Sequence, residues 1–442
     1  MANPILPFWE YIPDGEPRVF GDRVYLYGSH DRVAGHAFCD YKLKVWSAPL
    51  SDLNNWTCHG DSFRTRDGQR PADTDWTSAQ CFAPDVVGKD GKYYLYSYIV
   101  GSKGAVGVSD KPEGPFKCLG QYKYDDSVKV GDDGIFNDAG VLVDDDGRVY
   151  VYYGFESSNM NELDGSDMQT VLPGTHKHPV IDDNRELPPE ECFFEASSPR
   201  KVGDTYYLIY SPRKGSRLAY ATATSPTGPF TYRGYIIDNG VDYPAGNNHG
   251  SIMQINGQWY VFYHRMTNNT IMSRRACVEK INILPDGTIP PVEMTSLGFE
   301  DALNPYRLTP AEIACVLKGG CFIIEKDIFD RRITRITEGC IIGYKYFDFG
   351  QDFTGDKLTM ALDIGGMGTN CRVHVLLDDY ENGEEIGVFD IGTHDGVYKT
   401  KVKHLTGRHA IFLRCEQTVE GWMARYFQDK PLFELKGFTF MK

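Results

Sequence analysis

The sequence predicts an all-β protein in which a five-bladed β-propeller is followed by a β-sandwich of jelly-roll type. A short Gly-Asp, Asp-Gly or Asn-Gly turn, followed by an aromatic-rich strand, recurs five times before residue 300. The 442-residue chain contains 28 tyrosines, a residue that sheets favour. From about residue 306, β-rich runs alternate without the repeat.

The five turns define a unit that recurs about every 53–69 residues. A hairpin turn feeding a strand in every unit of this size is typical of one propeller blade per unit. We therefore expect five blades, in each of which the strand before the turn is the innermost one. The turn-and-strand segments are residues 21–27, 90–96, 146–152, 203–209 and 256–262.

An ionisable residue lies about five to eight positions before each turn, where a structural strand would carry Val or Ile. We therefore expect four carboxylates and one imidazole to converge at one end of the central channel. Convergent carboxylates on a rigid scaffold are suited to acid–base chemistry. The five residues are Asp14, Asp85, Asp138, Glu195 and His249.

The charge balance limits the possible partners. The chain has 46 basic and 61 acidic side chains, which gives a net charge of −15. Such a surface repels polyanions, so we expect no nucleic-acid or anionic-membrane partner and a neutral or cationic substrate. No apolar run approaches the ~18 residues that a membrane helix requires.

The cysteine pattern indicates a reducing compartment. The 11 cysteines are odd in number and include no C-x-x-C pair, which argues against paired disulfides, a zinc site or a redox motif. Residues 1–7 lack the basic stretch and apolar core of a secretory signal. We therefore expect a cytoplasmic protein.

A turn-rich segment at 284–291 and a linker extending to about residue 305 divide the chain. We predict a catalytic propeller domain at 1–300 and a sandwich at 306–442. Strands are expected at 357–362, 371–377 and 409–413. The polar segment 57–80 is expected to form a long loop over the channel mouth.

Residues 3–300 resemble glycoside hydrolase family 43, five-bladed enzymes that act on arabinose- and xylose-containing plant polysaccharides. The resemblance implies that Asp14 is the general base, that Glu195 is the general acid and that Asp138 modulates the acid. The matching segments are 3–7 with 13–20, 83–86, 137–147, 194–198 and 248–250.

The three carboxylates also fit these roles chemically. Inverting hydrolysis requires one protonated carboxyl to assist the leaving oxygen and one ionised carboxylate to deprotonate a water on the opposite face. Asp14 would be an ionised base that water can reach at the channel mouth. Phe193 and Phe194 would provide a partly apolar site that raises the pKa of Glu195. The charge of Asp138 nearby would favour the protonated acid.

Four further residues are candidates for binding. Asp85 would contact a substrate hydroxyl or make a structural hydrogen bond, and Arg265 would donate to a sugar oxygen or pair with a carboxylate. Phe82 is a candidate substrate contact and departs from the family, which commonly has Trp or Tyr at this position as the sugar-stacking residue. His249 is either a core histidine or a channel residue, and the resemblance implies a water-bound structural calcium beside it. The chemistry itself requires no cofactor.

Residues 310–442 resemble carbohydrate-binding module family 6 more faintly, through residues 343–349 and 435–440. The family usually places a ligand-binding Asn near the last strand, where this chain has Lys436. Trp422 would be a sugar-stacking platform or an ordinary edge or core aromatic.

The leading hypothesis is an inverting glycoside hydrolase that releases α-L-arabinofuranose or β-xylose from hemicellulose-derived oligosaccharides. The alternatives are an arabinanase or galactanase of the same fold, and a non-catalytic carbohydrate-binding propeller. The presence of all three acids argues against the last, since a lectin does not need them. The expected partner is an oligosaccharide or polysaccharide, and the oligomeric state is left open.

Overall fold

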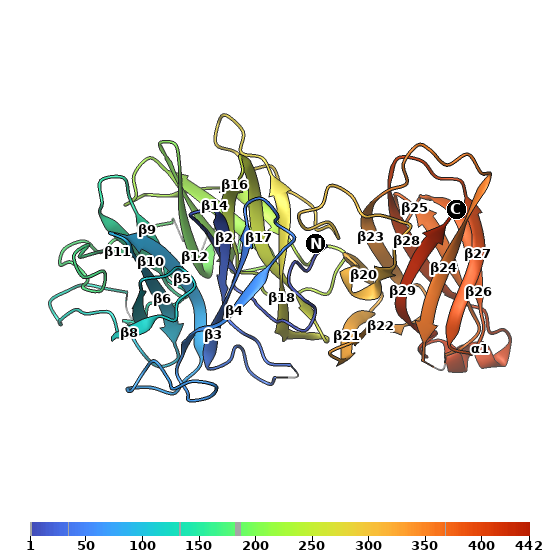
Figure 1. Ribbon diagram of the computed structural model, residues 1–442, viewed down its shortest axis with the longest axis horizontal. Coiled ribbons are helices and arrows are strands. Elements are labelled where there is room, and N and C mark those ends of the chain that lie inside the picture. The colour runs from blue at the N-terminus through green and yellow to red at the C-terminus, as the bar shows by residue number, and fades with distance from the viewer. Residues whose placement is uncertain (1, 34, 132–133, 182–186, 367) are drawn as a thin grey trace.

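The structure is a computed structural model that describes residues 2–33, 35–131, 134–181, 187–366 and 368–442. It is almost entirely β, as predicted, with one short α-helix, α1 (Trp422–Phe427), and one 3₁₀ turn, η1 (Ala311–Ile313), among the described residues. A group of five sheets and a two-sheet sandwich lie side by side along the long axis (Figure 1).

Each of the first five sheets is one blade of the propeller, built from consecutive antiparallel strands. Blade one contains β1 (Glu16–Phe20), β2 (Arg23–Gly28), β3 (Lys42–Pro49) and β4 (Thr57–Arg64). Blade two contains β5 (Cys81–Lys89), β6 (Lys92–Ile99), β7 (Ala105–Ser109) and β8 (Lys117–Gly120). Blade three contains β9 (Gly140–Val143), β10 (Val149–Tyr153) and β11 (Asn159–Leu163). Blade four contains β12 (Phe193–Val202), β13 (Thr205–Pro212), β14 (Arg217–Ala223) and β15 (Thr231–Asp238). Blade five contains β16 (Ser251–Ile255), β17 (Gln258–Thr267) and β18 (Thr270–Ile281).

The repeated turn joins the first and second strands of every blade, as the sequence predicted. The glycine of each turn has a φ angle between 58° and 84°, a left-handed conformation that glycine adopts without steric cost. This backbone requirement explains why glycine recurs in all five copies. The glycines are Gly21, Gly91, Gly147, Gly203 and Gly257.

The first strands of the blades form a closed ring. Contacts join β1 to β5, β5 to β9, β9 to β12, and β1 to β16. The remaining neighbours, β12 and β16, are joined by a hydrogen bond of 2.6 Å between Ser198 Oγ and Ser251 Oγ. The chain start strengthens blade five, because Ile5 N donates to the Ala276 carbonyl of β18 at 3.0 Å. The five inner strands therefore surround the central channel.

Aromatic rings plug the spaces between neighbouring blades. The Gly-Pro-Phe turns place Phe116 against Tyr27, with ring centroids 6.4 Å apart, and Phe230 against Tyr152, at 6.0 Å. All four side chains are buried. Burial of rings of this size contributes strongly to the hydrophobic packing between sheets.

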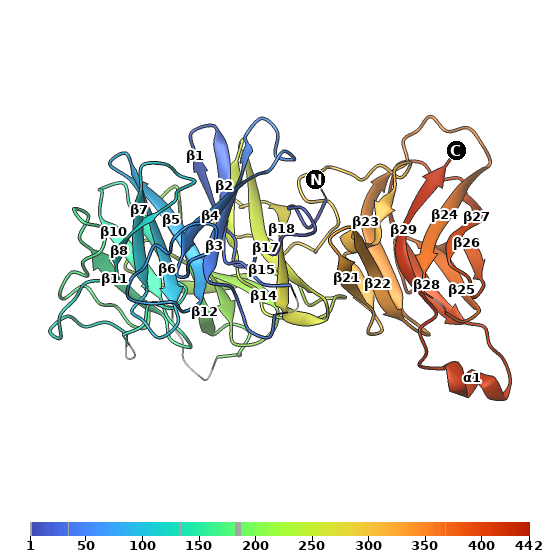
Figure 2. The ribbon, with the colours of Figure 1, turned by 60° about the horizontal axis from the view of Figure 1, so that its bottom comes forward.

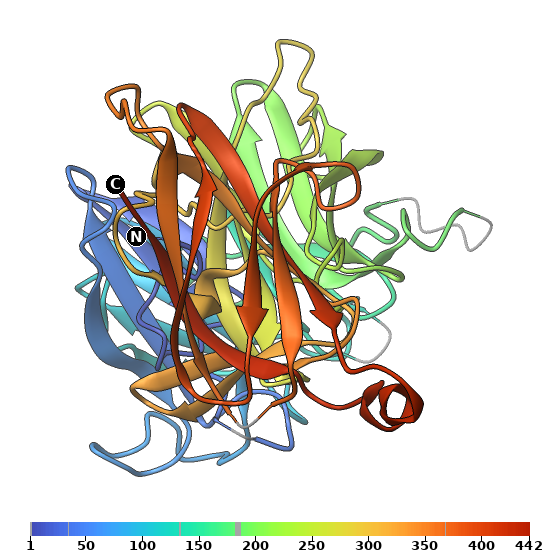
Figure 3. The ribbon, with the colours of Figure 1, turned by 90° about the vertical axis from the view of Figure 1, so that its right-hand side faces the viewer.

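The C-terminal region forms two antiparallel sheets (Figure 3), and buried apolar side chains of both belong to one cluster. One sheet has the order β21 (Phe322–Asp327), β22 (Asp330–Ile336), β29 (Phe433–Met441), β24 (Lys357–Gly365), β27 (Gly396–Lys403), with β19 (Thr309–Pro310) paired to β29. The other has the order β20 (Val316–Lys318), β23 (Ile341–Asp348), β28 (Arg408–Gln417), β25 (Cys371–Leu377), β26 (Glu384–Ile391). The three strands expected from the sequence correspond to β24, β25 and β28.

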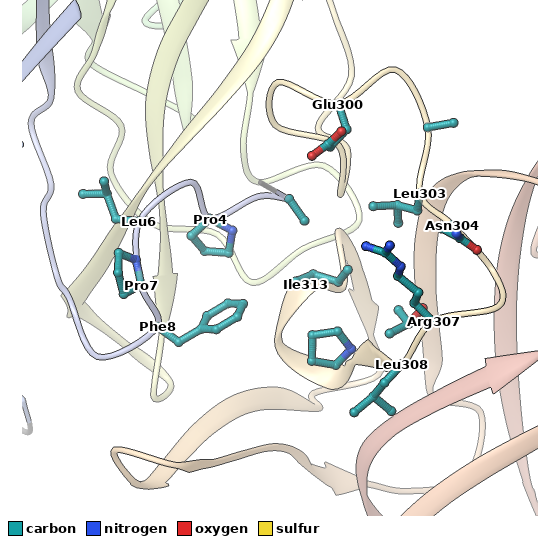
Figure 4. A pocket seen from close by; sticks show the side chains of 14 residues that line it. Pro4, Leu6, Pro7, Phe8, Glu300, Leu303, Asn304, Arg307, Leu308 and Ile313 are labelled. Atoms are coloured by element: carbon teal, nitrogen blue, oxygen red, sulfur yellow. The ribbon is translucent and has the colours of Figure 1, made fainter. Parts of the chain in front are cut away.

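The sandwich packs against blades four and five of the propeller, with β21 and β22 nearest to it (Figure 2). Tyr263 and Cys277 of blade five belong to the same buried apolar cluster as Ile313 and Val316 beyond the linker. A cavity of about 370 Å³ lies at this junction, between the N-terminal segment that includes Phe8 and the linker (Figure 4). The two parts therefore share a continuous core.

One segment that was predicted to be a loop is partly a strand. The segment 57–80 was expected to be a loop, but its first eight residues form β4, the outer strand of blade one. Backbone pairing with β3 overrides the weak apolar pattern there.

Among the described residues, no helix has the length and apolarity to cross a membrane.

Candidate active site

The predicted acids lie at backbone kinks at the heads of the inner strands. Asp14 and Asp138 each stand two residues before their strand, with φ angles of 56° and 45°. In β12 the positive φ, 68°, falls on Ala196, directly after Glu195. A left-handed backbone is uncommon for non-glycine residues, and such strain concentrates at functional sites.

These kinks bring four of the five ionisable residues together at the channel. His249 Nδ1 lies 3.8 Å from Asp14 Oδ1 and 3.8 Å from Asp138 Oδ2. Asp138 accepts a hydrogen bond from the main-chain N–H of Ala196, the residue after Glu195. The cluster is largely buried, so its charges interact strongly.

Arg274, on β18, is the counter-ion of Asp14. Its Nη1 donates to Asp14 Oδ1 at 2.9 Å, while its Nε donates to Asp31 Oδ2 at 2.9 Å. Burial raises the pKa of Asp14, but the opposing charge of Arg274 outweighs burial and leaves that pKa below its ordinary value. Asp14 is therefore ionised at neutral pH, as a general base must be.

His264, on β17, holds the main chain of Asp14 without adding charge. Asp14 N donates to His264 Nδ1 at 3.3 Å, and His264 Nε2 lies 3.1 Å from the Asn247 carbonyl. Burial, followed by the charge of Arg274, lowers the pKa of His264 to about 3. The ring is therefore neutral, with its proton on Nε2 and Nδ1 free to accept.

The pKa of Glu195, unlike that of Asp14, is raised. Burial raises its pKa, the charge of Asp14 raises it further, and Arg274 opposes both, so that the pKa is about 7. The residue is only half-buried, which leaves it accessible from the channel. Its neighbour Phe194 packs on Phe155 with ring centroids 4.8 Å apart, which supplies an apolar surface beside the carboxyl. A carboxyl with this pKa can carry a proton near neutral pH and release it.

Asp138 and Glu195 form a coupled pair. Burial, then the charges of Glu195 and Asp14, raise the pKa of Asp138 well above its ordinary value. Two coupled carboxyls lose their protons in steps that belong to the pair, so one proton is retained after the first has left. The hydrogen bond from Ala196 N–H favours the ionised form of Asp138. The retained proton therefore belongs to the pair of Asp138 and Glu195.

Replacing Asp138 with Asn tests this coupling. Without the neighbouring charge, Glu195 titrates alone, and its proton leaves nearer the pKa of about 7 that burial and Asp14 give it. The alkaline limb of the pH–rate profile should therefore move to lower pH. The acidic limb, governed by Asp14, is the internal control and should move much less. If the alkaline limb stays in place while KM rises, Asp138 only holds the sugar.

Asp85 does not join the cluster. Its Oδ2 accepts from Arg18 Nη2 at 2.7 Å and from Val141 N at 2.7 Å, and the residue is buried. The left-handed kink of β5 falls on Ala83, with a φ of 42°, so Asp85 lies two residues further along the strand. Of the two roles considered, the structure supports the structural hydrogen bond.

A second charged layer fills the channel beyond the acids. Glu16 pairs with Arg200 and accepts from Ser198 Oγ at 3.0 Å. Arg200 Nε also donates to the Ile252 carbonyl at 2.9 Å. Together with the Arg18–Asp85 pair, these contacts link the inner strands of all five blades. This layer holds together the inner strands from which the candidate catalytic residues project.

The predicted sugar contact of Arg265 needs correction. Its side chain is fully buried and donates to the carbonyls of Ala314, at 2.7 Å, Asn3 and Glu312. A guanidinium enclosed by main-chain oxygens at the junction with the sandwich is not accessible to a ligand in the channel. Phe82 is only half-buried and packs on Tyr98 at 5.8 Å between centroids, so its role as a substrate contact stays a prediction.

His249 was predicted to lie beside a calcium ion. Among the described residues, no group of three or more His, Cys, Asp or Glu side chains could hold a metal. Calcium takes six to eight oxygen ligands, whereas only the carboxyls of Asp14 and Asp138 lie 3.8 Å from His249 among the ion pairs of the described residues, and Asp14 is engaged by Arg274. The side chains present therefore do not fit a directly coordinated calcium.

Sequence reasoning missed Arg274, Asp31 and the contact of His264. Arg274 and Arg275 are consecutive arginines in a strand whose central residues are all buried. Because successive strand residues point to opposite faces, such a pair implies two separate buried partners. That signal could have identified Arg274.

One ionised and one protonatable carboxyl facing the same site are typical of glycoside hydrolases. The family model described as "Glycosyl hydrolases family 43" matches residues 1–289. The chain therefore belongs to glycosyl hydrolase family 43, and it is an enzyme that hydrolyses O-glycosyl bonds.

The similarity to two curated relatives extends beyond the propeller. The chain is 41% identical over 398 residues to a "Xylosidase/arabinosidase" of Thermoclostridium stercorarium, covering 78% of this chain and 82% of the relative. It is 27% identical to an "Arabinoxylan arabinofuranohydrolase" of Bacillus subtilis (strain 168), covering 89% and 85%.

Two solved structures are similar. The family 43 arabinoxylan arabinofuranohydrolase from Bacillus subtilis, in complex with cellotetraose, matches with a TM-score of 0.55 and 25% identity, covering 100% of this chain and 97% of that one. A β-xylosidase/α-arabinofuranosidase from a compost microbial metagenome, in complex with xylotriose and in a calcium-free form, has a TM-score of 0.56 and 28% identity, covering 66% and 97%.

Proposed function

We propose that the protein is an inverting enzyme that releases α-L-arabinofuranose or β-xylose from oligosaccharides derived from plant hemicellulose. The observation that carries the proposal is the pairing of an Arg274-bound, ionised Asp14 with a Glu195 whose pKa is about 7. The names of the relatives support the choice of pentose, because both the Thermoclostridium and Bacillus proteins are named for arabinose or xylose linkages.

In the proposed mechanism, Asp14 accepts a proton from a water molecule that attacks the anomeric carbon. Glu195 donates its proton to the glycosidic oxygen as the bond to the leaving group breaks. Arg274 keeps Asp14 ionised before attack, and Asp138 retains the proton on Glu195. Each turnover transfers a proton to Asp14 and removes one from Glu195, and exchange with solvent restores both.

Stereochemistry tests the mechanism. Proton NMR of the sugar first released from a nitrophenyl pentoside should show the anomer of inverted configuration, because a single displacement by water inverts the centre. A panel of arabinofuranosides, xylosides, arabinan and galactan assigns the substrate at the same time. Release of the retained anomer would make Asp14 a nucleophile and would contradict the proposal. Cleavage of internal arabinan or galactan bonds alone would instead identify an endo-acting enzyme of the same fold.

The remaining assignments are also proposals. We assign residues 1–300 to the catalytic domain and 306–442 to a carbohydrate-binding sandwich, where Trp422, with 82% of its surface exposed, is a candidate stacking platform rather than a core residue. The calcium-free form of the compost relative supports a structural calcium, which near His249 would have to be held through water. The described cysteines are all free, which supports a cytoplasmic location.

A further inference from the structure

Two adjacent arginines on β18 serve different partners. Arg274 holds the base Asp14, whereas Arg275 points to the other face of the strand and reaches the sandwich. Arg275 Nη2 donates to Glu325 Oε2 of β21 at 3.0 Å and to Tyr11 Oη at 3.0 Å. One strand of blade five thus connects the catalytic cluster with the C-terminal region.

Tyr11 connects the same carboxylate to the segment that carries the base. Its hydroxyl donates to Glu325 Oε2, and it stands three residues before Asp14. The Tyr11 carbonyl accepts from Asp31 N at 3.1 Å, and Asp31 in turn fixes Arg274. Glu325 therefore contacts both the segment that leads to Asp14, through Tyr11, and the strand that carries Arg274, through Arg275.

The main chain of β21 is also fixed to the propeller at this point. Asn268, at the tip of the β17–β18 hairpin, donates from its main-chain N to the Ile323 carbonyl at 2.7 Å, and its Oδ1 accepts from Glu325 N at 2.8 Å. Asn268 Nδ2 also donates to Tyr11 Oη at 3.1 Å. The position of Glu325 is thus determined by both its backbone and its side chain.

The contact is buried, and two arginines, Arg275 and Arg331, share the single carboxylate of Glu325. Tyr11 and Arg275 are each 1% exposed, and Arg331, 3.5 Å from Glu325, is 8% exposed. The guanidinium groups of Arg275 and Arg331 lie 5.8 and 5.7 Å from the ring of Phe8, which also lines the junction cavity (Figure 4). Loss of the Glu325 charge would leave two buried cations without their shared partner.

We propose that Glu325 of the sandwich is a positioning residue for the base Asp14, acting through Tyr11 and Arg275, so that the sandwich forms part of the catalytic framework. The inference rests on the proposed function, because that function assigns Asp14 as the base. It predicts that a charge lost in the sandwich slows the chemical step without weakening substrate binding.

The variant Glu325→Gln keeps the shape of the side chain and removes its charge. Its kcat on a nitrophenyl pentoside should fall about 10- to 100-fold, the effect of a small misplacement of a reacting group, while KM changes less than about twofold. Hydrogen–deuterium exchange of peptides covering residues 8–20 should become faster. Far-UV circular dichroism and thermal unfolding establish that the variant is folded.

Asp242→Asn is the matched control. Asp242 also crosses the junction, accepting from Lys318 Nζ at 2.7 Å and from Tyr380 Oη at 3.0 Å, but in the described part of the chain its side chain makes no hydrogen bond or ion pair with Asp14 or Arg274. This variant should keep wild-type kcat and wild-type exchange in residues 8–20. An equal loss in both variants would show general loosening of the junction and would overturn the proposal.

A folded Glu325→Gln enzyme with wild-type kcat and exchange would also overturn it. If Glu325→Gln does not fold, Tyr11→Phe, which removes only the bridging hydroxyl, decides: a lower kcat at unchanged KM supports the proposal, and an unchanged kcat rejects it. If the wild-type enzyme cleaves no pentoside, the proposed function fails. The exchange of residues 8–20 then decides the structural coupling by itself.

Discussion

Replacing Asp14 with Asn is expected to lower kcat by about 10²- to 10⁴-fold on every substrate, whatever its leaving group. The attacking water must lose a proton in all cases, and an amide cannot accept it. The side chain keeps its size, so KM should change little. Steady-state rates on pentosides with good and poor leaving groups measure the effect.

The substitution also tests the electrostatic assignment. Since Arg274 keeps the pKa of Asp14 below its ordinary value, the acidic limb of the wild-type profile should lie at lower pH than the titration of an ordinary aspartate. Asp144→Asn is the matched control, because Asp144 is also buried but pairs with Lys201, at 2.7 Å, and with Tyr206 in the turn of blade three. It should keep wild-type activity. Retention of activity in the Asp14 variant on both substrates would remove Asp14 as the base.

The blade count could be predicted because it depends on local backbone chemistry. Each hairpin needs a left-handed glycine, and a strand must follow it at once, so the repeat is written in consecutive residues. The third and fifth blades, for which three strands each are seen among the described residues, have the same turn between their first and second strands. Strand β4 was missed because its residues are polar and its stability comes from pairing with β3.

The acids could be located, but only approximately, by counting from the turns. The count succeeds for Asp14, Asp138 and Glu195 because each stands next to a left-handed kink at the head of its strand. It fails for Asp85, because the kink in β5 lies at Ala83 and a shift of two residues keeps the same face but changes the depth in the channel. The position of a residue along its strand depends on such kinks, and the sequence of one blade does not show where they fall.

The counter-ions could not be predicted in the same way. Arg274 and Arg265 are both buried arginines of blade five, yet one reaches Asp14 and the other reaches carbonyls beyond the propeller. The difference depends on which elements surround each side chain after the sandwich has packed against β17 and β18. Contacts between segments far apart in sequence decide it, and no local pattern records them.

Replacing Glu195 with Gln is expected to have an effect that depends on the leaving group. On xylo- or arabino-oligosaccharides, whose leaving alcohols need a proton, kcat should fall by about 10²- to 10⁴-fold. On nitrophenyl pentosides, whose phenolate leaves without protonation, the loss should stay within about tenfold. Glutamine fills the same space but has no proton to donate, so the loss measures general acid catalysis alone.

The pH profile gives an independent test of the same residue. In the wild-type enzyme the alkaline limb reports loss of the last proton held by Glu195 and Asp138, at or above the pKa of about 7 set by burial. In Glu195→Gln that limb should disappear for nitrophenyl pentosides, because no protonated carboxyl is needed there, while the acidic limb of Asp14 remains. An equal loss of kcat for good and poor leaving groups, with the alkaline limb retained, would assign the acid to another residue. Asp138, the other carboxyl of the coupled pair, would then be the candidate, and the double variant Asp138→Asn, Glu195→Gln would distinguish the two.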